Sequence, residues 1–267
     1  MAKGLSIHIG VNEVSAAHYA GWTGPLAACE ADAMDMHDLA RSLGYAAHPL
    51  LTRAAVLADL DRAAKDLVAG DILFVSYAGH GGQLPDENGD EDDDVDETWC
   101  LYDGQLCDDE IAVAWSKLAP GVRVILLSDS CHSGSVSRLL DPLAGARVDL
   151  DTRYRAAPAD VMLRTLRGNR GFYDAIVASL PGVVPVPRAT VRLISGCQDD
   201  QVSADGPFNG RFTGALKRVW DAGRFEGDYA AFHAAIVARM PADQQPNHLV
   251  IGPPDPAFDT QRPFHIG

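Results

Sequence analysis

The sequence predicts an α/β fold in which a central, mostly parallel sheet is flanked by helices. Apolar, strand-like runs alternate with helical patterns along the chain, which is typical of parallel strands joined by helical crossovers. Two runs, 71–77 and 122–127, are predominantly apolar, as strands buried on both faces are. The chain has 267 residues, 47% of them hydrophobic, so it can bury a substantial core. We expect one domain over residues 1–267.

The first half of the chain predicts elements in a regular alternation. Before the first predominantly apolar run we expect a strand, a helix, a short strand and a second helix, at 5–11, 25–43, 46–51 and 53–68. Gly44 is a typical stop after the first helix, and Thr52 has the residue type of an N-cap for the second. After the run 122–127, residues 191–195 predict a further strand.

The stretch between the last two strands has a different composition. Residues 140–187 hold several Pro and Arg residues and only a modest apolar pattern. We therefore expect a loop-rich insertion over 141–190, with one helix near 172–180. Two more helices are expected at 212–222 and 229–240, followed by a Pro-rich tail with one apolar run.

Charge and cysteine content exclude several classes of protein. A formal net charge of −15 argues against nucleic acid or an anionic membrane as the main partner. No run approaches the roughly 18 apolar residues of a membrane span, and the first five residues lack the apolar core of a signal peptide. The five cysteines are widely spaced without a Cys-x-x-Cys pair, so we expect reduced thiols and a cytoplasmic location.

A cysteine and a histidine follow two of the predicted strands directly. His80 lies in Tyr-Ala-Gly-His-Gly-Gly after the strand 71–77, and Cys131 lies in Asp-Ser-Cys-His-Ser-Gly after the strand 122–127. Carboxyl ends of parallel strands meet at one edge of a sheet, so the two side chains form a candidate nucleophile and base pair. His132 is a weaker base candidate, because a residue adjacent to Cys131 points elsewhere.

These two motifs closely resemble the metacaspase branch (orthocaspases and type I metacaspases) of the caspase-fold cysteine peptidases. Further matching segments follow in the family's order, at 9–12, 28–33, 89–97, 108–111 and 195–205. The resemblance implies a caspase-like fold and peptide-bond cleavage through an acyl-enzyme. It implies that Cys131 attacks, that His80 protonates the leaving amine, and that the N–H groups of Gly81 and Cys131 form the oxyanion hole.

The resemblance also implies substrates cut after Arg or Lys, that is, protein or peptide substrates with a basic P1 residue. A pocket for a guanidinium requires carboxylates at its base. The family pattern places Asp32 and Asp129 there, with Cys29 along the wall. Ala78 stands where the family often has Ser. Several arginines crowd the expected insertion, which is either a site of self-cleavage or an inert surface insertion with solubilising charges; they are Arg147, Arg153, Arg155, Arg164, Arg167 and Arg170.

An acidic run at 86–97 raises the question of a metal. An EF-hand register fails, because Glu91 occupies the position that requires Gly. The resemblance implies another calcium site, to which Asp96, Asp108 and Asp109 correspond. Its fourth position falls on Arg138, whose charge would oppose calcium unless Asp141 or the acidic run substitutes. Calcium activation is therefore a hypothesis.

Two alternatives stay open. One is a legumain- or gingipain-like peptidase of the same clan. The other is a catalytically idle, caspase-like module that binds partners in response to calcium. No organic cofactor is expected, and the regulatory partner, if there is one, is unknown from the sequence.

Overall fold

The computed structural model describes residues 2–50, 52–85, 95–131, 153–183, 185–198 and 201–267. The described residues form a six-stranded sheet in the order β2-β1-β3-β7-β8-β9. Neighbouring strands are parallel except β9, which runs antiparallel to β8. The strands are β1 (Gly4–Gly10), β2 (Ala46–Leu50), β3 (Ile72–Ala78), β7 (Arg123–Asp129), β8 (Thr190–Ser195) and β9 (Asn247–Ile251). The predicted α/β fold with a mostly parallel central sheet is confirmed.

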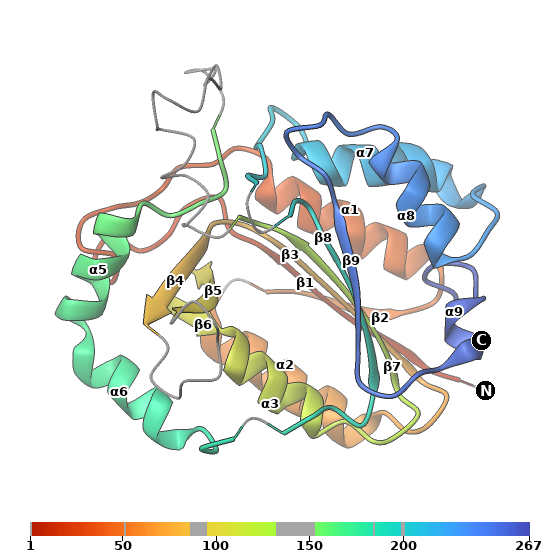
Figure 1. Ribbon diagram of the computed structural model, residues 1–267, viewed down its shortest axis with the longest axis horizontal. Helices are drawn as coiled ribbons and strands as arrows, with labels where there is room; N and C mark the ends of the chain where they lie inside the picture. Colours follow the sequence, from red (N-terminus) through yellow and green to blue (C-terminus); the bar gives the residue numbers. More distant parts are fainter. Residues whose placement is uncertain (1, 51, 86–94, 132–152, 184, 199–200) are drawn as a thin grey trace.

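Helices cover both faces of this sheet (Figure 1). One face packs against α1, α7 and α8, and the other against α2 and α3. The bounds are α1 (Cys29–Ser42), α2 (Arg53–Asp66), α3 (Asp108–Ser116), α7 (Arg211–Trp220) and α8 (Tyr229–Val237), with a 3₁₀ turn (Asp221–Gly223) after α7 and a short α9 (Pro256–Asp259) near the C-terminus.

The central strand β3 is apolar at every position except Ser76. Ile72 and Phe74 belong to the core shared with α1, α7 and α8, while Leu73 and Val75 belong to the core shared with α2 and α3. Successive side chains of a strand point to opposite faces, so a strand between two helical layers is apolar on both of its faces. β3 and β7 are buried along their whole length for this reason.

The first helix is shorter than the sequence predicts. The expected span of 25–43 becomes Cys29–Ser42, because the side-chain oxygen of Asn12 accepts the backbone N–H groups of Cys29 and Glu30 at the start of α1. A Cβ atom on Gly10 would lie 2.3 Å from the carbonyl oxygen of Cys29, so only glycine fits there. Together these contacts hold the first turn of α1 against the carboxyl end of β1.

The prediction that residues 141–190 form a loop-rich insertion is wrong for the second half of this range. Residues 159–179 form two helices, α5 (Ala159–Gly168) and α6 (Arg170–Ser179), where one helix near 172–180 was expected. α5 buries Val161, Met162 and Thr165 and packs on β4. The antiparallel sheet beside it consists of β4 (Gly81–Pro85), β5 (Val95–Leu101) and β6 (Gly104–Cys107). Residues 141–152 lie outside the described part of the chain.

Candidate active site

His80 and Cys131 lie at the same edge of the sheet. β3 and β7 are neighbours, and their last residues, Ala78 and Asp129, are paired. Each of the two candidates therefore lies two residues beyond a strand end, and both are buried. This juxtaposition is the one the sequence predicts, and it places a thiol and an imidazole where parallel sheets present functional groups.

His80 is held in a defined orientation by the loop before α1. Its Nε2 lies 2.8 Å from the carbonyl oxygen of Gly24, and its ring lies 4.8 Å from the ring of Trp22. A carbonyl only accepts hydrogen bonds, so Nε2 carries the proton of the neutral ring and Nδ1 is left with a free lone pair. Nδ1 has no hydrogen-bond partner among the described residues. Burial lowers the pKa of His80 to about 4, against the raising effect of Gly24, so the ring is neutral near pH 7 and Nδ1 can accept a proton.

A methyl group at position 24 is expected to disturb this orientation. In Gly24→Ala the Cβ would lie 2.4 Å from the Trp22 ring and 2.8 Å from Nε2 of His80. Because a displaced base can cost a large part of the rate, we expect peptide turnover to fall about a hundredfold. Gly21→Ala is the matched control: Gly21 also has a positive φ, but nothing lies within 4 Å of the added methyl. Equal losses in both variants would contradict the role of Gly24.

Two backbone N–H groups converge on a single carbonyl oxygen beside Cys131. The N–H groups of Gly81 and Cys131, the predicted oxyanion-hole pair, both donate to the oxygen of Arg155, each at 3.0 Å. A Cβ on Gly81 would come within 1.9 Å of the carbonyl oxygen of Cys131, so this close approach requires glycine. The arrangement is the one that stabilises negative charge developing on a carbonyl oxygen.

The segment around Arg155 lies in the site as an extended peptide would. The N–H of Arg155 donates to the oxygen of Ser203 at 3.0 Å, and the N–H of Asp205 donates to the oxygen of Arg153 at 2.8 Å. On its other side, the N–H of Ala157 donates to the oxygen of Gly81. Such added-strand pairing is how extended peptides are commonly recognised.

The side chain of Arg155 enters an acidic pocket and is fully buried. Its Nη2 lies 2.5 Å from Asp32 and 3.0 Å from Asp205, and its Nη1 lies 2.8 Å from Asp129. Asp32 comes from the first turn of α1, and Asp129 from the end of β7. The two carboxylates that the sequence assigns to one pocket are thus brought together around a guanidinium.

The pocket carboxylates have further donors of their own. Asp32 accepts from Nδ2 of Asn209 and from the N–H of Gly210, and Asp129 accepts from the N–H and hydroxyl of Thr213. Burial raises the pKa of Asp32 to about 6, although Arg155 lowers it. Above that pH the carboxylate is ionised, so the pocket carries negative charge that only a cation neutralises.

The remaining predicted pocket residues lie on its apolar wall. Cys29 and Ala78 pack together in one small buried cluster. Burial raises the pKa of the Cys29 thiol, while Arg155 acts on it in the opposite direction, so Cys29 borders the guanidinium as a neutral group. Ala78 offers no side-chain hydrogen bond.

Sequence reasoning missed three contributors to the site. Gly24 and Trp22 orient His80, and Asp205 adds a third carboxylate to the pocket. Asp205 belongs to a segment that resembles the family, but no motif there marks its side chain. The rival base His132 lies outside the described residues.

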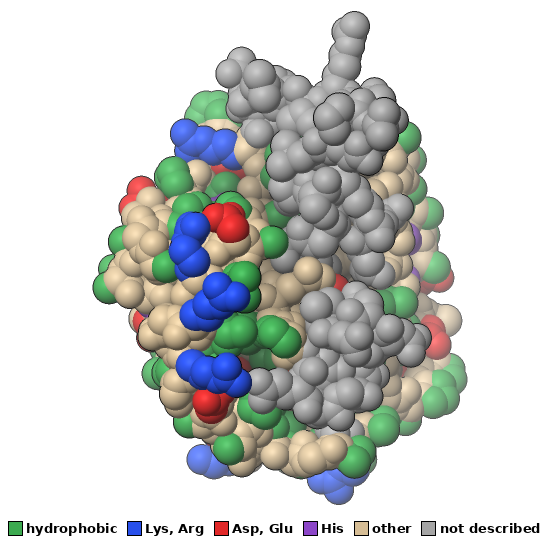
Figure 2. All heavy atoms as spheres, turned by 60° about the vertical axis from the view of Figure 1, so that its left-hand side comes forward, with side chains coloured by type: hydrophobic (Ala, Val, Ile, Leu, Met, Phe, Trp, Pro, Cys, Tyr) green, Lys and Arg blue, Asp and Glu red, His purple; other side chains and the backbone are tan. Residues whose placement is uncertain are grey.

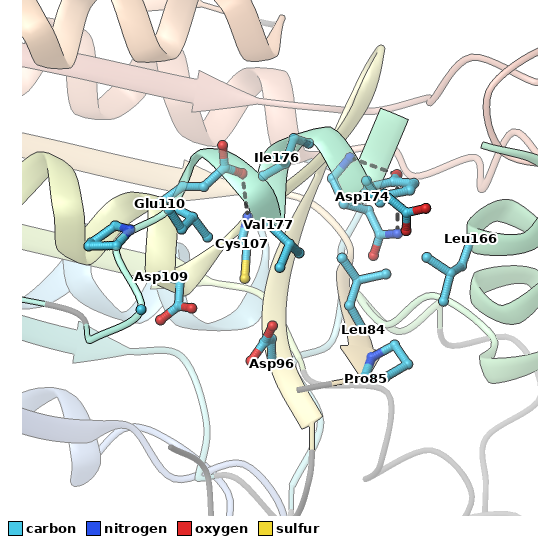
Figure 3. A pocket seen from close by; sticks show the side chains of 15 residues that line it. Leu84, Pro85, Asp96, Cys107, Asp109, Glu110, Leu166, Asp174, Ile176 and Val177 are labelled. Carbon is cyan, nitrogen blue, oxygen red and sulfur yellow. Dashed lines mark hydrogen bonds between the residues drawn. The ribbon is translucent and has the colours of Figure 1, made fainter. Parts of the chain in front are cut away.

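The predicted calcium ligands are brought together only in part. Among the described residues, one cluster has its potential ligand atoms within 4.8 Å of one another, and it consists of Asp96, Asp108 and Cys107 rather than Asp109. Asp109 lines, with Asp96 and Cys107, a neighbouring cavity of about 260 Å³ under α6 (Figure 3).

Two carboxylates suit a hard cation, but the thiol does not. Burial raises the pKa of Cys107 far above its usual value, and its Sγ donates to Asp108. Calcium takes 6–8 oxygen ligands, so these described side chains alone do not form its site. Arg138, Asp141 and the acidic residues 86–94 lie outside the described part of the chain.

Comparison with known proteins gives a consistent result. A family model for the caspase domain matches residues 14–256. Metacaspase-1 of Kluyveromyces lactis is 30% identical over 246 residues, which cover 78% of this chain and 55% of that protein. Metacaspase-1 of Emericella nidulans is 29% identical over 80% of this chain and 60% of its own. The chain thus spans little more than half the length of these curated relatives.

Two solved structures share the fold. A protein from Geobacter sulfurreducens has a TM-score of 0.90 at 51% identity and covers 99% of both chains. Caspase-1 from Spodoptera frugiperda has a TM-score of 0.55 at 12% identity, covering 94% of this chain and 86% of its own, which shows the fold alone. No helix in the described residues is both long and apolar enough to cross a membrane. The chain belongs to the caspase domain family of cysteine peptidases and, within it, resembles the metacaspases.

Proposed function

We propose that this chain is an endopeptidase that cuts after arginine, and that its own Arg155–Ala156 bond is a substrate. One observation carries the proposal. The carbonyl oxygen of Arg155 accepts both N–H groups of the predicted oxyanion hole, while its side chain fills the acidic pocket. A substrate's P1 residue must meet both conditions at once.

The reaction follows from these positions. The Sγ of Cys131 attacks the carbonyl carbon of Arg155, and the thiol proton passes to Nδ1 of His80. The oxygen becomes negative between the N–H groups of Gly81 and Cys131. The bond to Ala156 then breaks, the proton moves from His80 to the departing amine, and a thioester joins Cys131 to Arg155. Water, deprotonated by His80, then attacks the thioester; the C–S bond breaks, the Arg155 carboxyl group is released, and the Cys131 thiolate takes the proton back from His80.

The resting position of the Cys131 thiol adds one step to this sequence. The thiol of Cys131 hydrogen-bonds the backbone of Ser203 rather than His80. Attack therefore requires Sγ to leave Ser203 by rotation of the Cys131 side chain.

Arg155 is favoured over the other arginines of the expected insertion. Arg164 and Arg170 lie on α5 and α6, are exposed, and pair with acidic residues one helical turn away. Figure 2 shows Lys and Arg side chains gathered beside hydrophobic ones on this side of the molecule. Helical segments cannot add as a strand to the site, whereas residues 153–157 already do. Arg147 lies outside the described residues.

The alternatives are less well supported. An idle binding module has no need of two N–H groups aimed at a carbonyl oxygen, nor of a histidine with a free Nδ1. A legumain- or gingipain-like enzyme is less consistent with the metacaspase relatives. We also propose protein substrates in a reducing cytoplasm, which the five free thiols support.

The test is hydrolysis of one fluorogenic peptide made with Arg or with Asp before the cut. We expect the Arg peptide to react at least about a thousandfold faster, because like charges in a buried pocket cost several kcal/mol. Faster cleavage of the Asp peptide would refute the proposed specificity. The same assay in excess chelator tests calcium activation, supported by the carboxylates of Asp96 and Asp108: the proposal expects activity to be lost, and full activity would contradict it.

A further inference from the structure

Asp205 is a third acidic residue of the pocket, and backbone N–H groups outside the pocket hold its carboxylate in place. Its side chain is 2% exposed. Its Oδ2 accepts the N–H of Ala27 at 2.7 Å, and its Oδ1 accepts the N–H of Ala28 at 3.3 Å, just before α1. Oδ1 also lies 3.0 Å from Nη2 of Arg155. The carboxylate therefore keeps its place whether or not a cation fills the pocket.

The three carboxylates bind the two terminal nitrogens of the Arg155 guanidinium. Asp129 pairs with Nη1, whereas Asp32 and Asp205 share Nη2. The three carboxylates around the planar guanidinium thus come from different elements of the fold. Asp129 lies at the end of β7, Asp32 in the first turn of α1, and Asp205 in the segment that pairs with the bound strand. Arginine fits such an arrangement because its donors are spread over a rigid plane.

Lysine cannot reproduce this set of contacts. Its three N–H donors leave a single nitrogen on a shorter side chain, so they do not span Asp129 on one side and the Asp32–Asp205 pair on the other as Nη1 and Nη2 do. No hydroxyl stands at position 78 to bind an ammonium, since the residue there is Ala78. A buried carboxylate that loses its partner is costly, so a lysine that leaves Asp205 unpaired is disfavoured.

We propose that Asp205 is the residue that makes this pocket select arginine over lysine; this inference rests on the proposed function. Asp32 and Asp129 supply attraction for any cation. Asp205 adds a second carboxylate to Nη2, which Asp32 also binds, so a guanidinium that gives Nη1 to Asp129 meets all three carboxylates. Without Asp205, the pocket keeps two carboxylates and loses most of its discrimination.

The experiment compares kcat/KM for two peptides that differ only in Arg or Lys before the cut, with wild type and Asp205→Asn. Asn keeps one acceptor oxygen, which serves Ala27 or Ala28 but not both, and it has no charge. We expect the Arg peptide to lose about 10- to 100-fold and the Lys peptide less than about threefold, because one charged pair is removed for Arg alone. The Arg-to-Lys ratio therefore falls at least about tenfold.

Asp221→Asn is the matched control. Asp221 is an exposed surface carboxylate with a positive φ that Asn tolerates, so its loss is expected to leave the ratio unchanged. If Asp205→Asn does not fold, as judged by thermal unfolding, Asp205→Glu replaces it. Glu keeps the charge but moves the carboxylate one methylene, and we expect it to lower the ratio while preserving the preference for Arg.

The outcomes separate the inference from the proposed function. Equal losses on both peptides, or an unchanged ratio, would overturn the selective role of Asp205 while leaving an arginine-cutting peptidase intact. A wild-type enzyme that cuts neither peptide would instead refute the proposed function. A wild-type ratio near one would overturn the inference alone.

Discussion

Replacing Cys131 by Ala is expected to reduce hydrolysis of an Arg peptide by about 10⁴-fold or more, because removing the nucleophile of a covalent mechanism leaves only the other stabilising groups. The Cys131→Ala chain is also expected to stay intact on incubation. The assay is turnover of the fluorogenic peptide alongside denaturing gel electrophoresis.

The control for this variant is Cys100→Ala. Cys100 is another buried thiol, in the core shared with α2 and α3. Its loss creates a small cavity but removes no reacting group, so activity per folded molecule should be retained. If Cys131→Ala kept its turnover, Cys131 could not be the nucleophile.

Replacing Arg155 by Ala is expected to have two opposite effects. The chain should no longer be cut after residue 155. In the wild type, self-cleavage must free the pocket from Arg155 before an Arg peptide can bind, so we expect a delay in turnover that Arg155→Ala lacks. At the same time three buried carboxylates lose their cation. Removing one partner of a buried ion pair costs about 3–5 kcal/mol, so the Tm should fall. An added guanidinium ligand such as agmatine should raise it again.

Arg164→Ala is the control for the arginine. Arg164 is 55% exposed on α5 and pairs with Asp160, so its loss should change neither the delay nor the Tm appreciably. Progress curves and thermal unfolding measure both quantities. A wild-type delay that persists in Arg155→Ala would show that Arg155 does not block the pocket.

The sequence predicts the positions of His80 and Cys131 well, because two apolar strands end just before them and parallel strands end at one edge. Asp32 and Asp129 came from the resemblance to a family, and the structure brings them together. The helix α5 was missed, since Pro and Arg residues around it masked the spacing of Val161, Met162 and Thr165.

Other features depend on contacts that no local pattern carries. Arg155 was one of six candidate arginines. Its place in the site follows from pairing with Ser203, which lies 48 positions away along the sequence. Asp205 acts in the pocket because the same pairing brings its segment beside α1. Gly24 orients His80 across 56 positions. Such long-range contacts become visible only when the fold is known.

The most direct measurement is the mass and N-terminal sequence of the fragments that the purified wild-type chain forms on incubation. The proposed function predicts two fragments, 1–155 and 156–267, the second beginning at Ala156, and a single intact chain for Cys131→Ala. A first cut at any other residue, or a wild-type chain that stays intact while it hydrolyses the Arg peptide, would contradict the assignment of Arg155 as the bound substrate residue.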